Sequence, residues 1–268
     1  MRWTKIKNII LLLLVAVNLF LLALVGVRAW RTRENSRAAR ERILQILENN
    51  GIAYLPGQIP GDLSLTPRRL PPASVGEAEA RLLVGEITSA EALGSRIVYH
   101  GERGTVTLFS DRELEVLFHP QTQLSAEVPG LLSVLGLSLE EARTPAQSEA
   151  AVTTWTQLWE GTPVPGETVR LESRGEWAQS LTFRLFAGEA EAVLPAGEPI
   201  TAPTAILRLL DALNRQGYVC SQITGFYAGY SLSGAGPTLT LAPMWYVEID
   251  AAPWRLMIDG YTGEVSTE

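Results

Sequence analysis

The longest apolar run of the chain lies near its N-terminus and limits what the rest of the protein can be. It covers residues 9–27, and only Asn18 and Gly26 interrupt it. As a helix these 19 residues would be about 28 Å long, close to the hydrocarbon thickness of a bilayer. A secretory signal usually has a shorter apolar region, followed by a cleavage site of small residues. Here Trp30 and several arginines follow at once, so we predict a retained anchor over residues 9–30. The alternative is a signal peptide that is cut inefficiently.

The basic residues on the two sides of this run leave its orientation nearly balanced. Three precede it and five follow it: Arg2, Lys5 and Lys7, then Arg28, Arg31, Arg33, Arg37 and Arg40. The second cluster is mixed with acidic residues and is followed by a large mass, which favours an N-terminus inside the cell. We therefore expect a single-pass protein of the cell membrane. Residues 1–8 would be a cytoplasmic tail, the anchor would contact the lipid bilayer, and residues 31–268 would be extracytoplasmic.

The composition after the anchor excludes one class of partner and one kind of cross-link. The formal net charge is −7 even with the basic flanks included, whereas nucleic-acid binding needs a basic surface, so no nucleic-acid partner is expected. Cys220 is the single cysteine, so it cannot form a disulfide within the chain. In the alternating context GYVCSQI it is predicted to be a small buried hydrophobic residue, not a nucleophile or a metal ligand.

Apolar periodicity predicts helices that alternate with groups of strands. Helices are expected over about 35–50, 144–159 and 203–216, and strands over 80–120 (beginning with ARLLVGEI), 167–196 and 218–265. Hairpin turns are expected at GERG and ESRGEW, and Pro129-Gly130 begins a predicted connection between two units. The expected fold class is α+β, with helices laid on antiparallel sheets. The expected exterior units are 31–130 and 131–268.

Few residues of the chain suggest chemistry. His100 and His119 each lie in a strand-like run near a turn, and neither forms a metal-binding spacing with the other or with Cys220. No nucleophile motif of the type GxSxG is present. We therefore predict no catalytic residue, no cofactor and no metal site. Trp155 and Trp159 stand at helical spacing and are predicted to pack in the core, with a ligand platform as the alternative.

Asn18 is an amide in the middle of the predicted anchor. Its donors and acceptors would be unpaired in hydrocarbon unless another helix met them. On a helix it shares one face with Leu11, Leu14, Leu22 and Val25. We predict that this face contacts the membrane helix of a partner; the alternative is that Asn18 has no role.

Both ends of the chain resemble the YycH/YycI family of Gram-positive bacteria. At the start, Trp3, Lys5 and Lys7 lead into the run NLFLL at residues 18–22, and the segment RERILQILENNGIAYLPGQIP resembles the family's first exterior helix and its exit. The end, PMWYVEIDAAPWRLMIDGYTGEV, resembles the closing hairpin of YycI and of PepSY-like domains. The matching residues are Pro243, Trp245, Val247, Ile258, Asp259, Thr262, Gly263 and Glu264.

The resemblance implies a function as well as a fold. It implies a non-catalytic accessory protein that regulates an essential cell-wall-sensing histidine kinase, a two-component sensor, through membrane and exterior contacts. A sister YycH/YycI-like protein would join it in a hetero-oligomer. Two other classes stay open. One is a PepSY-like inhibitory module that restrains an exterior protease or cell-wall hydrolase. The other is a membrane-tethered enzyme, which the lack of a compact polar motif disfavours.

Replacing Asn18 by Leu tests the predicted membrane contact. Hydrogen bonds between membrane helices are worth about 0.6–2 kcal/mol, so Asn18→Leu should weaken association with the partner's helix about three- to thirty-fold without abolishing it. Crosslinking within the membrane at matched expression measures this, with a swap of the whole anchor as the control. An unchanged signal for Asn18→Leu beside a clear loss for the swap would contradict the role of Asn18.

Overall fold

The structure is a computed structural model that describes most of the chain after the predicted anchor. The described residues are Leu14, Val17, 40–54, 60–61, 63–70, 76–120, 122–124, 126–141, 150–186, 190–195, 197–234, 238–250 and 255–267. Leu14 and Val17 are helical and exposed. The rest of the predicted anchor lies outside the described residues, including Leu11, Asn18, Leu22 and Val25 of its predicted contact face. Among the described helices, none is both long and apolar enough to span a membrane.

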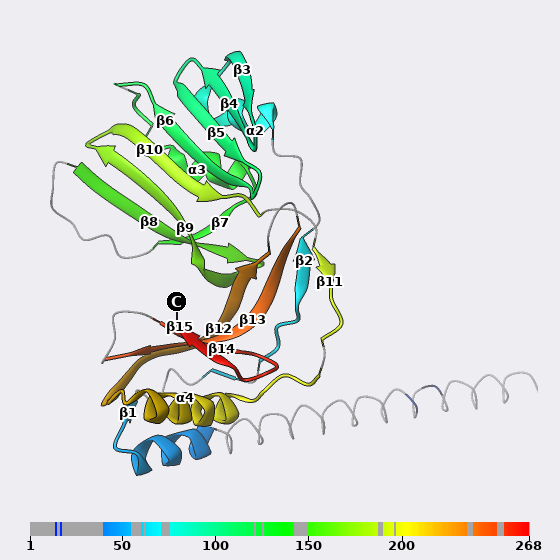
Figure 1. The fold of residues 1–268 in the computed structure, drawn as a ribbon, viewed down its shortest axis with the longest axis vertical. Coiled ribbons are helices and arrows are strands. Elements are labelled where there is room, and N and C mark those ends of the chain that lie inside the picture. Colours follow the sequence, from blue (N-terminus) through cyan, green and yellow to red (C-terminus); the bar gives the residue numbers. More distant parts are fainter. Residues whose placement is uncertain are drawn as a thin grey trace, which may run out of the picture.

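An eight-stranded sheet forms the upper part of the molecule in Figure 1. Its order is β3 (Ile87–Leu93), β4 (Arg96–Gly101), β5 (Gly104–Phe109), β6 (Glu113–Phe118), β10 (Trp177–Arg184), β9 (Thr162–Arg174), β8 (Ala150–Trp159) and β7 (Ser138–Glu141). Every neighbouring pair is antiparallel. The sheet is therefore built from hairpins, and the pair β6–β10 joins its two halves.

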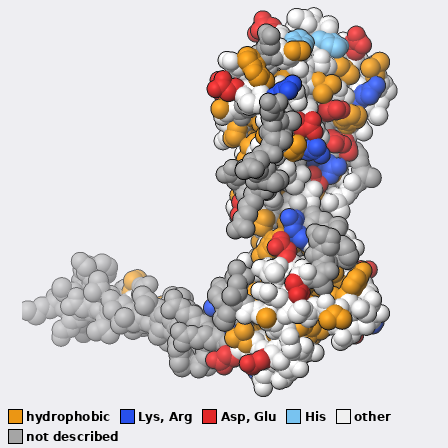
Figure 2. Space-filling view, turned by 90° about the vertical axis from the view of Figure 1, so that its left-hand side faces the viewer, with side chains coloured by type: hydrophobic (Ala, Val, Ile, Leu, Met, Phe, Trp, Pro, Cys, Tyr) orange, Lys and Arg blue, Asp and Glu red, His pale blue; other side chains and the backbone are white. Residues whose placement is uncertain are grey.

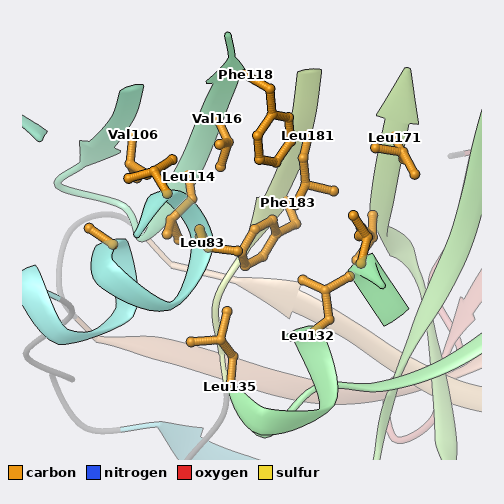
Figure 3. Close-up of a cluster of buried hydrophobic side chains, with 14 of the residues drawn as sticks. Leu83, Val106, Leu114, Val116, Phe118, Leu132, Leu135, Leu171, Leu181 and Phe183 are labelled. Carbon is orange, nitrogen blue, oxygen red and sulfur yellow. The ribbon is translucent and has the colours of Figure 1, made fainter. Parts of the chain in front are cut away.

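One face of this sheet is buried by two short helices, α2 (Glu77–Val84) and α3 (Val128–Val134). Strand β6 shows why, because its residues alternate strictly: Leu114, Val116 and Phe118 are buried, and the residues between them are not. Figure 3 shows these side chains pointing toward Leu83 of α2 and Leu132 of α3. The period of two thus sorts apolar side chains to the helix side and polar ones to the opposite face.

A seven-stranded sheet forms the lower part. Its path is β1 (Ala53–Tyr54), β12 (Gln222–Ser233), β13 (Leu239–Ile249), β14 (Leu256–Asp259) and β15 (Val265–Thr267), with β2 (Arg68–Leu70) on β13 and β11 (Glu191–Ala192) on β2. Only β1 pairs in parallel among the described strands. The helical residues 40–49 and α4 (Ala202–Gln216) bury Ile43, Leu47, Ile206 and Leu209 against Trp245 and its neighbours.

A third apolar cluster joins the two sheets. It contains residues from both: Leu70, Trp159, Val164, Phe186, Tyr230, Leu239 and Leu241. The ring centroids of Trp159 and Phe186 lie 6.3 Å apart. Strand β12 passes so close to β9 that a Cβ at Gly229 would lie 2.8 Å from the carbonyl oxygen of Pro163, so only glycine fits there. Dense packing of this kind fixes the two sheets against each other.

Several predicted elements are confirmed. The expected α+β class is correct, and the helix at 203–216 is α4. Its N-cap is Thr201, and its C-cap is Gly217, a residue with φ of 72°. The helical residues 40–49 and the turns at GERG and ESRGEW are also as expected. The closing hairpin is present, because Trp245 pairs with Ile258 in the register of β13 with β14.

Two predicted elements are wrong. Residues 150–159 are strand β8, not a helix, because Val152 and a series of threonines and tryptophans favour the extended backbone over the coincidental helical spacing. ARLLVGEI is not a strand: its first residues belong to α2, where Glu79 accepts a 2.7 Å hydrogen bond from the backbone N–H of Gly76 and closes the first turn. The residues before 150 in the predicted helix lie outside the described part of the chain.

The predicted boundary between two units at residue 130 does not coincide with a boundary between the two sheets. Residue 130 lies within α3, and β6 before it pairs with β10 after it. The seven-stranded sheet combines residues 53–70 with residues 191–267. The two sheets are therefore defined by pairing between segments that are distant in the chain. Local composition does not encode this pairing.

The alternation of buried and exposed side chains predicts different losses of stability for substitutions on the two faces of the sheet. Leu181 is 0 % exposed and Leu117, on the adjacent strand, is 54 % exposed. Leu181→Ala should lower the free energy of unfolding by about 2–5 kcal/mol, because it leaves a cavity, whereas Leu117→Ala should change it by less than about 0.5 kcal/mol. Urea unfolding measures both. Equal losses would contradict the assignment of the two faces.

Candidate functional site

The face of the eight-stranded sheet opposite α2 and α3 carries a groove of about 720 Å³. We call the surface around it the open face and define it by alternate residues of three central strands: Glu113, Glu115 and Leu117 on β6, Ser180, Thr182 and Arg184 on β10, and Thr168, Arg170 and Glu172 on β9. Their neighbours in sequence point into the core. The open face is thus polar because each strand has one apolar side only.

The strand register places these side chains in rows across the sheet. Glu115 lies opposite Thr182, which lies opposite Arg170, and Ser180 lies between Leu117 and Glu172 in the next row. Side chains directly opposite one another in a sheet are in contact range. The groove floor therefore presents hydroxyl, carboxylate and guanidinium groups at fixed spacing.

Carboxylates outnumber guanidinium groups in the groove. Four glutamates line it, at 113, 115, 167 and 172, against Arg170 and Arg184. Arg170 Nη2 donates to Glu172 Oε1 at 2.8 Å, and Arg184 Nη1 donates to Glu167 Oε1 at 2.7 Å. Both arginines are therefore engaged, and the excess negative charge can receive a cationic partner. Figure 2 shows acidic and basic side chains close together on the upper part of the molecule.

A bulge in β9 positions Glu167. From Thr156 to Gln157 strand β8 advances by one residue, while the partners on β9 change from Thr168 to Val164. Residues 165–167 therefore have no partner on β8. Pro165 has no N–H for a ladder bond and Gly166 carries no side chain, so both suit an irregular segment. The bulge turns Glu167 toward Arg184, where only 13 % of its side chain is exposed.

Burial and charge act in opposite directions on Glu167. Burial raises the pKa of this carboxyl above its ordinary value, and the neighbouring Arg184 guanidinium lowers the pKa in part. Arg184 is held on two sides: Asp111 Oδ2 lies 3.5 Å from its Nη2, and the fully buried Gln157 donates from Nε2 to its backbone carbonyl at 3.0 Å. This ion pair is therefore a fixed part of the groove.

A second hollow of about 460 Å³ lies at the end of the same strands. It is lined by Phe118, His119, Pro120, Arg174, Trp177, Ala178 and Gln179. Trp177 is partly exposed on the first residue of β10. An aromatic ring beside a polar groove offers an apolar contact for a bound side chain.

The two histidines considered in the sequence analysis contact neighbouring residues of the β4–β5 hairpin. His100 Nδ1 lies 3.3 Å from Thr105 Oγ1, and His119 Nδ1 lies 3.1 Å from the carbonyl oxygen of Glu102, so each histidine is tied to the strands around the β4–β5 turn. Among the described residues, no group of three or more His, Cys, Asp or Glu side chains lies close enough to hold a metal ion. Trp159 is buried in the cluster between the sheets and Trp155 packs, partly buried, against the core of the upper sheet, as predicted.

Cys220 is half-buried, packs against the lower core and donates from Sγ to the carbonyl oxygen of Gln222 at 3.5 Å. Burial raises the pKa of its thiol to about 11, and the nearby Asp250 adds to this effect. The thiolate population at neutral pH is therefore very small. The sequence predicted a buried residue at this position, whereas the thiol is half-buried.

Sequence reasoning missed the open face. The alternating run of Thr168, Arg170 and Glu172 and that of Ser180, Thr182 and Arg184 are visible in the sequence as polar positions between apolar ones. They mark two half-exposed strands, but nothing local says that β6 lies beside β10. The groove required the pairing of segments about sixty residues apart.

Replacing Arg184 tests the ion pair of the groove. Arg184→Gln removes the group that lowers the pKa of Glu167, so this pKa should rise further. A carboxyl with a raised folded pKa binds its proton more tightly in the folded state, so its ionisation opposes folding above the ordinary range of glutamate. The variant should therefore lose about 1–3 kcal/mol at neutral pH and much less near pH 4.

Urea unfolding at both pH values and carboxyl ¹³C NMR measure the two effects. The control is Arg170→Gln, whose exposed pair with Glu172 should contribute less than about 1 kcal/mol. A loss for Arg184→Gln that is the same at both pH values would contradict this account of Glu167.

Comparison with known proteins gives limited similarities. Neither the protein families nor the curated proteins include a match. Among solved structures, an uncharacterized protein from Eubacterium rectale aligns over 78% of this chain and 88% of its own, with a TM-score of 0.48 and 9% identity. The C-terminal domain of Bacillus megaterium YpeB aligns over 72% of this chain and 97% of its own, with a TM-score of 0.38 and 11% identity. At these scores neither alignment bears on function, which we take from the residues of this chain.

Proposed function

We propose that this chain is a membrane-anchored, extracytoplasmic accessory protein that binds the exterior part of a sensor histidine kinase and adjusts its activity. The observation that carries the proposal is the open face. It is a groove on the sheet face opposite α2 and α3, and its lining contains more carboxylates than guanidinium groups. A surface of this kind suits a polypeptide partner, because it is broad and its side chains are fixed by the sheet.

The closing hairpin supports a PepSY-like lower unit in this proposal. Asp259 Oδ1 accepts hydrogen bonds from the backbone N–H groups of Tyr261 and Thr262, at 2.9 and 2.7 Å. Gly263 has φ of 73°, which suits glycine, and completes the turn into β15. Asp259, Thr262 and Gly263 are among the residues on which the resemblance to YycI and PepSY-like domains rests. We infer that the lower unit positions the open face, and that a sister protein and the anchor supply further contacts.

The charge balance of the open face specifies the partner surface. Arg170 and Arg184 are paired within the groove, whereas Glu113 and Glu115 add charge beyond these pairs. The kinase surface in contact should therefore be rich in Lys and Arg. Since the open face is solvated, its attraction should fall as salt concentration rises.

An inhibitory module for an exterior protease or cell-wall hydrolase is the second candidate. The hollow beside Trp177 continues from the same strands and offers an apolar contact for a protruding side chain. The two candidates share the open face, so the identity of the partner distinguishes them: one predicts altered kinase autophosphorylation, the other altered hydrolysis.

A charge reversal on the open face tests the proposal. Glu113→Lys with Glu115→Lys should weaken binding of the full chain in nanodiscs to the kinase at least about tenfold, which corresponds to about 1.4 kcal/mol, because like charges would then meet. Surface plasmon resonance at two salt concentrations measures it. The matched control is Glu198→Lys, an exposed glutamate outside the eight-stranded sheet.

One outcome of these measurements would exclude the open face as the contact, and another would favour the second candidate. Equal affinities for the folded reversal variant and the control would remove the open face as the contact. Failure of the unaltered chain to bind the kinase, together with inhibition of a wall hydrolase or protease, would favour the second candidate over the first.

A further inference from the structure

The upper sheet ends in a strand whose outer edge is well suited to pairing. Among the described residues, β3 pairs with β4 alone, and every side chain from Thr88 to Leu93 is exposed. It has seven residues, against four for β7 at the other end of the sheet. End strands are usually protected by shortness, proline or basic residues. Strand β3 has none of these; its protective features are one charged residue, Glu91, and an irregularity between Ile87 and Ser89 at its start.

The hairpin with β4 determines which backbone groups point outward. Leu93 and Arg96 face each other across the two-residue loop 94–95. The pair that closes such a loop exchanges both of its hydrogen bonds, and hydrogen-bonded and non-hydrogen-bonded pairs then alternate along the strand. Counting back from Leu93, the N–H and C=O groups of Ala92 and Ala90 point away from β4.

We propose that two copies of this chain associate by antiparallel pairing of their β3 strands about a twofold axis at Ala90. A twofold axis can pass through either kind of residue pair in an antiparallel ladder. Ala90 lies at the middle of the seven-residue strand with its hydrogen-bonding groups outward, whereas an axis at Glu91 would place two carboxylates opposite each other. The register that follows places Ala90 opposite Ala90, Glu91 opposite Ser89, Ala92 opposite Thr88 and Leu93 opposite Ile87.

This register is complementary in size and in charge. The two Glu91 carboxylates face serines of the other copy, so no like charges are directly opposed. Small alanines meet at the axis, and apolar side chains meet at both ends. The one irregularity of the strand lies between Ile87 and Ser89, so the centre of the pairing stays regular. A strand from an unrelated protein would need no such symmetric pattern, which is why we assign the edge to a second copy.

Pairing has a consequence for the open face. Opposite residues in an antiparallel pair point to the same side of a sheet. The open faces of the two copies would therefore lie on one side of a continuous sheet, and a partner with two contact sites would bind both. The pairing rests on β3, which does not line the groove, so it stands independently of the proposed function.

Single cysteines test the register in the full chain, in membranes, on a Cys220→Ser background and with copper phenanthroline as oxidant. In the paired strands the Cα atoms of two copies of residue 90 would lie about 5.5 Å apart, within disulfide range, whereas those of residue 92 would lie about 14 Å apart. Ala90→Cys should therefore form a disulfide-linked dimer and Ala92→Cys should not.

Mixing Thr88→Cys with Ala92→Cys should give a dimer of the two different variants. A monomeric Ala90→Cys, or equal crosslinking at 90 and 92, would overturn the proposal.

A charge at the axis gives a second, non-covalent test. Ala90→Glu should raise the dissociation constant of the dimer in nanodiscs at least tenfold, as measured by sedimentation. The control is Ala192→Glu, an exposed alanine on the short strand β11 of the other sheet. Because each copy carries a net charge of −7, added salt should strengthen the pairing, opposite to its effect on a cationic partner at the open face. An unchanged dissociation constant in the folded Ala90→Glu variant would also overturn the proposal.

Discussion

The burial of one face only of the eight-stranded sheet is the constraint on which the rest of the upper structure depends. Helices α2 and α3 cover a single side, and residues such as Val116 and Leu181 fill the space between helices and strands. Because strand residues alternate in direction, this burial forces Glu115 and Thr182 onto the opposite face. The candidate binding surface is therefore a direct product of how the core is made.

The junction between the sheets depends on residues that belong to neither face alone. Trp159 and Phe186 pack with Tyr230, whose hydroxyl donates to the carbonyl oxygen of Thr66 at 3.2 Å. Gly229 lets β12 approach β9 at Pro163, two residues before the bulge begins. The bulge that turns Glu167 toward Arg184 is thus next to the contact that joins the sheets. A substitution that changes the packing at this junction should displace residues of the groove, because a densely packed interior transmits strain.

The molecule offers two different kinds of contact. The open face presents fixed side chains and an excess of carboxylates, which attract over distance and weaken with salt. The edge of β3 presents backbone groups, whose pairing depends on register more than on side-chain charge. In our two proposals the chain recognises a partner through charge and its own copies through hydrogen bonds, and the two contacts can be altered separately.

The sequence alone determined the elements whose signals are local. Helix α4 follows from its apolar spacing and from Gly217, the strands of the closing hairpin follow from their aromatic and β-branched residues, and the turn at ESRGEW follows from its glycine. The tertiary structure decided which strands lie next to each other. It paired β8 with β9 on one side and β7 on the other, and it brought β10 beside β6. Helix spacing and turn preferences act over a few residues. Strand pairing and the groove built on it join segments that are distant in the chain, and no local pattern records such a partner.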